Sequence, residues 1–174
     1  MTTPIVYINC HDAGRLIQPY GHPVATPHLQ RFAEESVFFR NAHTVSPTCS
    51  PSRAALLTGR FPPQIGLIGL SHRGFRLTDH HDHLAMRLRK KGHFTALSGV
   101  EHTGTDMGQP GAFVFDAHLA GALPDETLGT RDRRAAEAAA RFIEEQADDD
   151  HPFYLECGFF APIARIRKIM TKAR

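Results

Sequence analysis

The stretch Ile5-Val6-Tyr7-Ile8-Asn9-Cys10-His11-Asp12 has the pattern of a strand that ends in polar residues. Residues 5–10 form a short run rich in β-branched and aromatic side chains, which predicts a buried strand. His11 and Asp12 follow it directly, and Gly14 marks the turn that stops it. Polar residues at the end of such a strand lie where α/β folds bind their ligands. This segment therefore predicts both a fold class and the place of a site.

The rest of the chain alternates between helical and strand patterns. Thr26 and Pro27 predict the start of a surface helix, in which apolar residues repeat at helical spacing as far as Val37. Further helices are expected over residues 52–58, 79–91 and 131–147, further strands over residues 94–98 and 153–157, and a long loop region over residues 104–129. Helices that alternate with buried strands predict an α/β fold with a mostly parallel sheet covered by helices on both faces.

Length and composition are those of one globular domain. The chain has 174 residues, of which 41% are hydrophobic and 22% charged, and a domain typically has about 150 residues. The net charge of +2 is too balanced for a general nucleic-acid binder. No apolar run approaches the roughly 20 residues that cross a bilayer, and the first residues lack the pattern of a secretory signal. We therefore expect a cytoplasmic protein without nucleic-acid or membrane partners.

The cysteines and clustered histidines allow several interpretations. Cys10, Cys49 and Cys157 are far apart and odd in number, which favours free thiols over disulfides or a zinc knuckle. The segment Asp79-His80-His81-Asp82-His83 has the ligand types of a zinc site, but a solvated turn at a helix start is the interpretation we favour. His43 precedes Cys49 by six residues, as in a Cys-His hydrolase, although the surrounding sequence has no recognisable protease pattern.

The segment from Ser46 to Arg60 carries the clearest signal of chemistry. Cys49 stands just before Pro51, which can start a helix, so the thiol is expected near unpaired backbone N–H groups and the positive end of the helix dipole. Such a position binds anions and activates thiols. Arg53, about one turn along the helix, can direct its guanidinium to the same place. The alternative is a buried structural cysteine before a helix that merely begins with proline.

The run Cys49-Ser50-Pro51-Ser52-Arg53, followed by Leu57-Thr58-Gly59-Arg60, resembles the signature of the type I sulfatases. Three other segments resemble the family in the same order: Thr26-Pro27-His28-Leu29, Phe38-Phe39-Arg40-Asn41-Ala42 and Gly92-His93-Phe94-Thr95-Ala96. The opening His-Asp-x-Gly-Arg and Leu70-Ser71-His72-Arg73-Gly74-Phe75 resemble the heparan N-sulfatase-like branch. The resemblance implies an alkaline phosphatase-like fold that is incomplete at the C-terminus. Residues 1–160 would form the N-terminal part of a sulfatase catalytic domain, and residues 161–174 a short, basic, divergent tail.

The resemblance also implies a reaction, the hydrolysis of a sulfuric ester or sulfamate. In the family, a formylglycine-generating enzyme oxidises the cysteine that matches Cys49, and it reads the residues that match Pro51 and Arg53. The hydrated aldehyde attacks sulfur with one oxygen, and its second hydroxyl later expels sulfate. A Ca²⁺ or Mg²⁺ ion would polarise the sulfate. The implied partners are the generating enzyme and a sulfated small molecule or sugar.

Individual roles follow from the resemblance residue by residue. Asp12 is the expected metal ligand, together with His11, which stands where an acid is commoner, and with the modified Cys49. Arg53 would bind the sulfate through its planar fork of donors. His102, in Gly99-Val100-Glu101-His102, matches a histidine that donates a proton or contacts sulfate. The alternatives are a polar strand-end cap for Asp12 and a solvated loop histidine for His102.

Two departures from the family pattern bear on activity. Val100 stands where the family has a lysine, and after residue 156 the chain shows neither a histidine nor an Asp-Asn metal pair. We therefore expect a truncated form with little turnover of its own. Two other functions stay open: a non-catalytic remnant that binds an anion or a partner, and a phosphonate or phosphate monoester hydrolase of the same superfamily.

Overall fold

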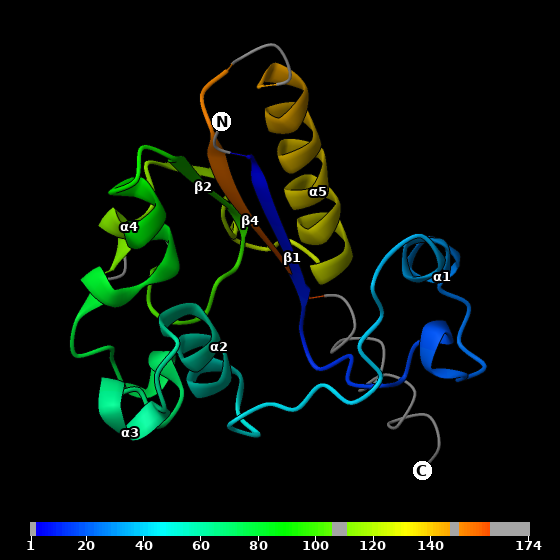
Figure 1. Ribbon diagram of the computed structural model, residues 1–174, viewed down its shortest axis with the longest axis horizontal. Coiled ribbons are helices and arrows are strands. Elements are labelled where there is room, and N and C mark those ends of the chain that lie inside the picture. Colours follow the sequence, from blue (N-terminus) through cyan, green and yellow to red (C-terminus); the bar gives the residue numbers. More distant parts are fainter. Residues whose placement is uncertain (1–2, 106–110, 147–149, 161–174) are drawn as a thin grey trace.

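A four-stranded parallel sheet forms the centre of the molecule (Figure 1). The structure is a computed structural model that describes residues 3–105, 111–146 and 150–160. The strands are β1 (Ile5–Cys10), β2 (Phe94–Gly99), β3 (Ala117–Ala120) and β4 (Phe153–Phe159), and their order in the sheet is β1-β4-β2-β3. All neighbouring strands are parallel, as the sequence predicted. The expected basic tail, residues 161–174, lies outside the described residues.

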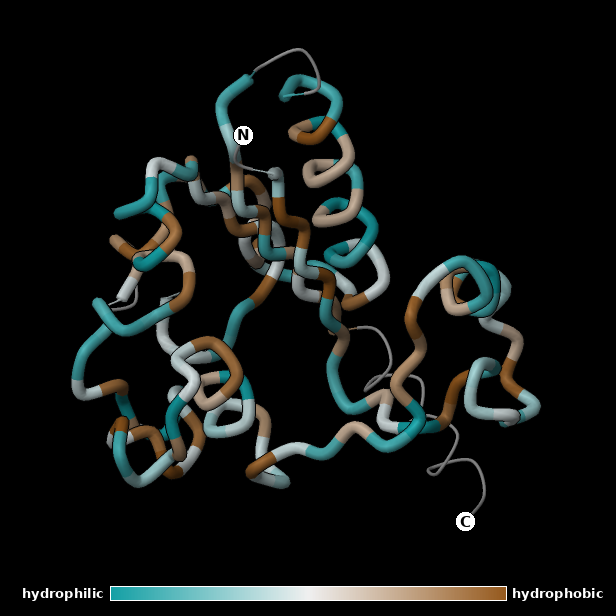
Figure 2. The backbone as a smooth tube through the Cα atoms, in the orientation of Figure 1, coloured by the Kyte–Doolittle hydropathy of each residue, from teal (hydrophilic) through white to brown (hydrophobic). Residues whose placement is uncertain are grey.

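Helices cover both faces of this sheet. The described helices are α1 (Pro27–Glu34), α2 (Cys49–Thr58), α3 (Pro62–Ile65), α4 (Leu84–Arg89) and α5 (Leu128–Glu145), and of these α4 and α5 pack on the sheet. Met86 of α4 packs in one apolar cluster with Tyr154, whereas Phe142 of α5 packs in another with Leu155. Because neighbouring residues of a strand point to opposite faces, α4 and α5 lie on opposite faces of β4. Apolar residues accordingly run through the central strands in Figure 2.

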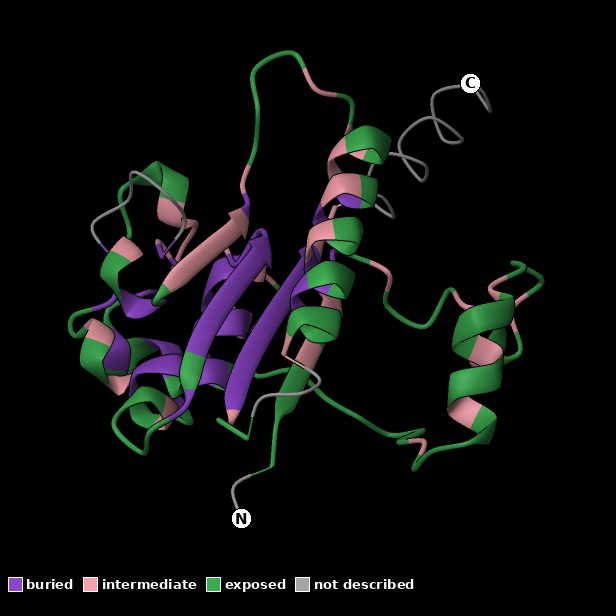
Figure 3. Ribbon diagram, turned by 90° about the horizontal axis from the view of Figure 1, so that it is seen from above, coloured by how far each residue is buried: buried purple, intermediate pink, exposed green. Residues whose placement is uncertain are grey.

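The exposure of β1 corrects the expectation of a buried strand. β1 is at the edge of the sheet and pairs only with β4. Its Ile8 side chain is 65% exposed, whereas β2 and β4 are buried along nearly their whole length (Figure 3). The apolar run indicates a strand, but it does not indicate how many neighbours the strand has, and the described helices leave β1 largely uncovered.

The helix expected after Thr26 is present as α1, and it lies on the surface. Pro27 begins it, and no residue of α1 is buried. Phe32 is 69% exposed, and Figures 1 and 3 both show α1 apart from the sheet. Thus the apolar repeat of this helix is not covered by the residues that the structure describes. None of the described helices is both long and apolar enough to span a membrane.

Several element boundaries differ from the sequence prediction. The helix expected over residues 79–91 is interrupted at His83, whose backbone is extended and whose Nδ1 accepts a hydrogen bond from the Ala85 N–H at 3.1 Å. Only a 3₁₀ turn, His80–Asp82, precedes that cap. The helix expected at residue 52 begins at Cys49, and α5 begins at Leu128 behind its Thr127 cap. The loop region 104–129 contains β3, which is too short for a clear alternating pattern.

The carboxyl ends of β2 and β4 approach each other unusually closely. The Val100 N–H donates to the Gly158 carbonyl at 3.2 Å. A Cβ added to Gly158 would lie 1.8 Å from the Val100 carbonyl oxygen. A Cβ added to Gly99 would lie 2.1 Å from the Gly158 carbonyl oxygen. Gly99 also has a φ of 87°, a conformation that favours glycine. Both glycines are therefore required where these strands end, which is the edge that carries the site.

Candidate active site

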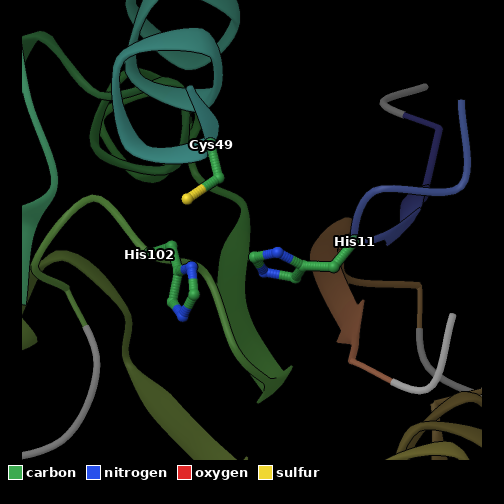
Figure 4. Close-up of side chains that lie close together, drawn as sticks. All are labelled: His11, Cys49 and His102. Atoms are coloured by element: carbon green, nitrogen blue, oxygen red, sulfur yellow. The ribbon is translucent and has the colours of Figure 1, made fainter. Parts of the chain in front are cut away.

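Three side chains from separate segments converge at the carboxyl edge of the sheet (Figure 4). His11 follows β1, Cys49 begins α2, and His102 follows β2. The Cys49 Sγ and one ring nitrogen of each histidine all lie within 4.8 Å of one another. His11 is 2% exposed, and the other two residues are half-buried. The structure therefore brings together three of the residues that the sequence had marked as site residues.

His11 is held in place from the α5 side of the sheet. The His11 ring stacks on Phe160, with centroids 4.5 Å apart and planes at 5°. The backbone N–H of His11 donates to the Phe159 carbonyl at 3.0 Å. The Phe160 N–H in turn donates to the Asp132 carboxylate, at 2.8 and 3.0 Å. The Arg131 guanidinium lies 4.5 Å from the centroid of the Phe160 ring. The start of α5 thus fixes the residue against which His11 packs.

A serine links the start of α2 to the loop that carries His102. The Ser71 hydroxyl donates to the His102 carbonyl at 3.1 Å, and the Ser71 N–H donates to the Ser50 hydroxyl at 3.2 Å. His102 itself has a φ of 71°, so its backbone needs such support. In the sequence, Ser71 stands out only as part of a segment that resembles the family. Its positioning role depends on contacts between residues that are distant in sequence.

Arg53 and Asp12 share a cavity with Cys49. This cavity has a volume of about 400 Å³. Arg53 lies one turn along α2 from Cys49, is 9% exposed, and donates from Nη1 to the Asn9 side-chain carbonyl. Asp12 is exposed, and its φ is 48°. Among the described residues, the close cluster of possible metal ligands contains His11, Cys49 and His102 but not the Asp12 carboxylate.

Both histidines of the cluster are held in the neutral form. Burial, followed by the positive charge of Arg53, lowers the pKa of His11 to about 3 and that of His102 to about 4. The buried Nε2 of His11 and Nδ1 of His102 have no hydrogen-bond partner among the described residues. A neutral imidazole has one nitrogen with a free lone pair, so the site presents nitrogen acceptors to a ligand.

A buried polar network lies directly behind His102. Glu101 is fully buried, and its Oε2 accepts hydrogen bonds from the Thr103 N–H and hydroxyl at 2.8 and 2.6 Å and from the Thr105 hydroxyl. Its Oε1 lies 3.6 Å from the Nε2 of His83. Burial alone would raise the pKa of Glu101, but His83 and the two threonines lower it to about 2. The expected solvated turn is wrong for His83, which is 0% exposed, because the helix break turns it inward.

Two other sequence positions have clear places in the structure. His43 is exposed and lines a different cavity from the one that holds Cys49, together with Ala55 and Phe61. This arrangement does not support a Cys-His hydrolase. Val100, at the position of the family lysine, is 4% exposed and brings no charge. The positive charge beside Cys49 therefore comes from Arg53.

Comparison with known proteins identifies the family of this chain. A family model described as Sulfatase matches residues 5–159. Human N-sulphoglucosamine sulphohydrolase is 35% identical over 141 residues, which cover 80% of this chain and 27% of the relative. An arylsulfatase of Klebsiella aerogenes is 33% identical over 147 residues, which cover 72% of this chain and 31% of the relative. The chain thus spans well under half the length of these relatives.

Solved structures show the same fold. Ps i-CgsB has a TM-score of 0.75 at 22% identity, covering 93% of this chain and 46% of that protein. A 2-O GAG sulfatase has a TM-score of 0.70 at 23% identity, covering 93% and 35%. The phosphonate monoester hydrolase SpPMH from Silicibacter pomeroyi has a TM-score of 0.64 at 18% identity, covering 92% and 41%. The expected sulfatase-like α/β fold is confirmed, and the chain belongs to the sulfatase family.

Proposed function

We propose that this chain carries the nucleophile and the sulfate-binding groups of a formylglycine-dependent sulfatase. The observation that carries the proposal is the position of Cys49, which begins α2, faces His102 and shares a cavity with Arg53. Membership of the sulfatase family supports it. The proposed substrate is the sulfuric ester or sulfamate of a small molecule or sugar. The proposed partner is a formylglycine-generating enzyme, and the proposed location is cytoplasmic.

The start of α2 has the chemistry of an anion site. Thr48, the N-cap residue, makes no side-chain hydrogen bond to the first turn, so the positive end of the helix faces the cavity without a side-chain cap. Arg53 adds a guanidinium, which binds the oxygens of a tetrahedral anion through paired N–H donors. These groups would hold the sulfate with its sulfur close to the side chain of residue 49 and stabilise the charge of the transferring group.

His102 is suited to moving a proton at this site. Its imidazole is neutral at pH 7, since burial and Arg53 lower its pKa to about 4. A bound sulfate brings negative charge and raises that pKa. A bound substrate would therefore increase the proton affinity of His102, which stands where it could pass a proton to the leaving oxygen or nitrogen. One oxygen of the formylglycine hydrate would attack sulfur as the alcohol or amine leaves. The second hydroxyl would then lose its proton and re-form the aldehyde, which breaks the C–O bond to sulfate and releases it.

The cation implied by the family resemblance is Ca²⁺ or Mg²⁺, and the described donors do not fit it by themselves. These ions bind six or more oxygen ligands. The cavity around Cys49 offers the Asp12 carboxylate, but the close ligand cluster consists of two imidazoles and a thiol. Nitrogen and sulfur ligands suit softer ions. The described residues therefore do not form a Ca²⁺ or Mg²⁺ site by themselves.

The test is co-expression with a formylglycine-generating enzyme, followed by hydrolysis of an aryl sulfate and of a sulfated amino sugar with Ca²⁺ supplied. Cys49→Ala is the blank. Turnover above this blank supports the proposal if, per converted residue 49 as counted by peptide mass spectrometry, it is lost in Arg53→Ala. Conversion of Cys49 with sulfate binding but no turnover indicates the non-catalytic remnant. Faster turnover of a phosphonate or phosphate monoester indicates the related hydrolase, and unconverted Cys49 beside a converted control sulfatase contradicts the proposal.

A further inference from the structure

The donor atoms closest to Cys49 are nitrogen and sulfur. The Cys49 Sγ and a ring nitrogen of both His11 and His102 lie within 4.8 Å of one another, and in Figure 4 the three side chains point into one space. Ligands at about 2.0–2.3 Å from a tetrahedral Zn²⁺ ion are roughly 3.3–3.8 Å apart. Side-chain rotations on the order of 1 Å would therefore close this cluster around an ion.

A second observation points to a ligand at the same place. His11 is 2% exposed, and its buried Nε2 has no hydrogen-bond partner within the described part of the chain. The Nδ1 of His102 is also buried and also has no hydrogen-bond partner among the described residues. Buried polar atoms are nearly always paired, because an unpaired one loses its interaction with water without replacement. A cation between the two rings would satisfy both histidines at once.

We propose that the chain with Cys49 as a thiol binds a transition-metal ion of the Zn²⁺ class through His11, Cys49 and His102. Imidazole and thiolate are the ligands that such ions prefer, whereas Ca²⁺ and Mg²⁺ prefer oxygen. Water or the nearby Asp12 carboxylate would complete four-coordination. This inference concerns the unconverted cysteine, and it holds or fails independently of the proposed sulfatase function.

Charge and support at the site are consistent with such an ion. Binding displaces the thiol proton of Cys49, and the resulting thiolate reduces the charge of the ion. The nearby Arg53 guanidinium opposes a cation, but its Nη1 is directed to the Asn9 side chain. The ring of His11 is held from outside by its stack on Phe160, and the backbone that carries His102 is held by the Ser71 hydroxyl on its carbonyl. Supporting contacts of this kind orient metal ligands before the ion arrives.

The test uses the full chain, produced without a formylglycine-generating enzyme and kept reduced. Zn²⁺ is titrated by calorimetry, and Co²⁺ binding is followed by its absorption spectrum. We expect one ion per chain, a thiolate-to-cobalt charge-transfer band, and slower alkylation of Cys49 by iodoacetamide when Zn²⁺ is present. A Co²⁺ spectrum without the charge-transfer band would overturn the proposal. This measurement uses the unaltered chain, so it does not depend on a variant that might misfold.

Variants identify the ligands. Cys49→Ser and His102→Ala should each weaken Zn²⁺ binding by more than the roughly 10- to 100-fold that follows loss of a supporting contact. Cys10→Ser and His28→Asn remove an exposed thiol and an exposed imidazole, and they should leave the affinity unchanged. His11→Asp should weaken Zn²⁺ and strengthen Ca²⁺ binding, because it exchanges nitrogen for oxygen. Circular dichroism checks that each variant folds. Loss of binding in Cys10→Ser but not in Cys49→Ser would mean that Cys49 is not the thiolate ligand and would overturn the proposal.

Discussion

The imidazole rings of His11 and His102 meet edge to face, with centroids 4.3 Å apart and planes at 74°. This contact joins the end of β1 to the end of β2, although β4 lies between these strands in the sheet. A proton on either ring would place a positive charge against the other ring and near Arg53. Stability and the protonation of this pair are therefore coupled.

The first prediction is that the free energy of unfolding falls as pH drops below about 6.5, the pKa of histidine in an unfolded chain. Burial first, and Arg53 second, lower the folded pKa values to about 3 for His11 and about 4 for His102. Between these limits the unfolded chain binds protons that the folded chain does not. Each ring contributes a slope of up to about 1.4 kcal/mol per pH unit. Urea denaturation at several pH values, with a chelator present, measures this slope.

Variants test whether His11 and His102 cause this pH dependence of the free energy of unfolding. His11→Asn should make it shallower, because the pair then has only one titrating ring. His28→Asn removes an exposed histidine of α1 and should leave the slope as it is. Equal slopes for the original chain and His11→Asn would show that His11 does not have the lowered pKa.

The second prediction is that Cys49 is the only one of the three cysteines that a formylglycine-generating enzyme converts. It alone has proline two residues on and arginine four residues on, in Pro51 and Arg53. Pro51→Ala and Arg53→Lys should each lower the converted fraction, whereas Ser52→Ala, between them, should lower it least. Peptide mass spectrometry after co-expression measures the fraction. An aldehyde at Cys10 or Cys157 would contradict the prediction.

The third prediction concerns the network behind His102. Glu101→Gln should destabilise the fold by about 1.5–3 kcal/mol at pH 7, because the charged acceptor of the Thr103 and Thr105 hydrogen bonds is lost. The original chain should lose the same contribution in acid. Since the pKa of Glu101 is lowered to about 2, its contribution is complete above about pH 4.5 and disappears as pH falls toward 2.

Chemical denaturation at pH 7 and at pH 3 tests this network. The difference in stability between the original chain and Glu101→Gln should be smaller at pH 3. His81→Asn, at an exposed histidine of the adjoining 3₁₀ turn, should change stability by less than about 0.5 kcal/mol. A difference that is the same at both pH values would mean that Glu101 acts through its shape rather than its charge.

Sequence patterns predicted the local elements well and the long-range contacts poorly. The start of α2 at Cys49 was approximately foreseen, because Pro51 and Gly59 mark the two ends of the helix locally. The burial of His83 could not be foreseen, since it depends on Glu101, which is distant in sequence and packs against it in the fold. The same holds for Ser71, whose partners Ser50 and His102 come from two other segments.

The exposure of β1 has a similar explanation. Hydrophobic side chains at positions 5, 6 and 8 predict a strand, but they do not determine its place in the sheet order. Identification of the site from sequence depended on the family resemblance. His11, Cys49 and His102 converge because β1 and β2 end at the same edge of the sheet and α2 begins there, and spacing along the chain does not reveal this. Phe160, which stacks on His11, carried no recognisable signal.

The last prediction is that Gly158→Ala destabilises the fold and separates the two histidines. The added Cβ would lie 1.8 Å from the Val100 carbonyl oxygen, and because that atom belongs to the backbone, no side-chain rotation relieves the overlap. β2 and β4 would have to move apart where Val100 N–H donates to Gly158 at 3.2 Å. We expect a loss of at least about 3 kcal/mol, the upper end of typical overpacking costs.

Gly129→Ala is the matched control, since its Cβ meets nothing within 4 Å and it lies in α5. Because Gly129 is exposed in the first turn of α5, that change should alter stability by less than about 0.5 kcal/mol. Urea denaturation followed by circular dichroism compares the two variants, and equal stabilities would refute the close approach of β2 and β4.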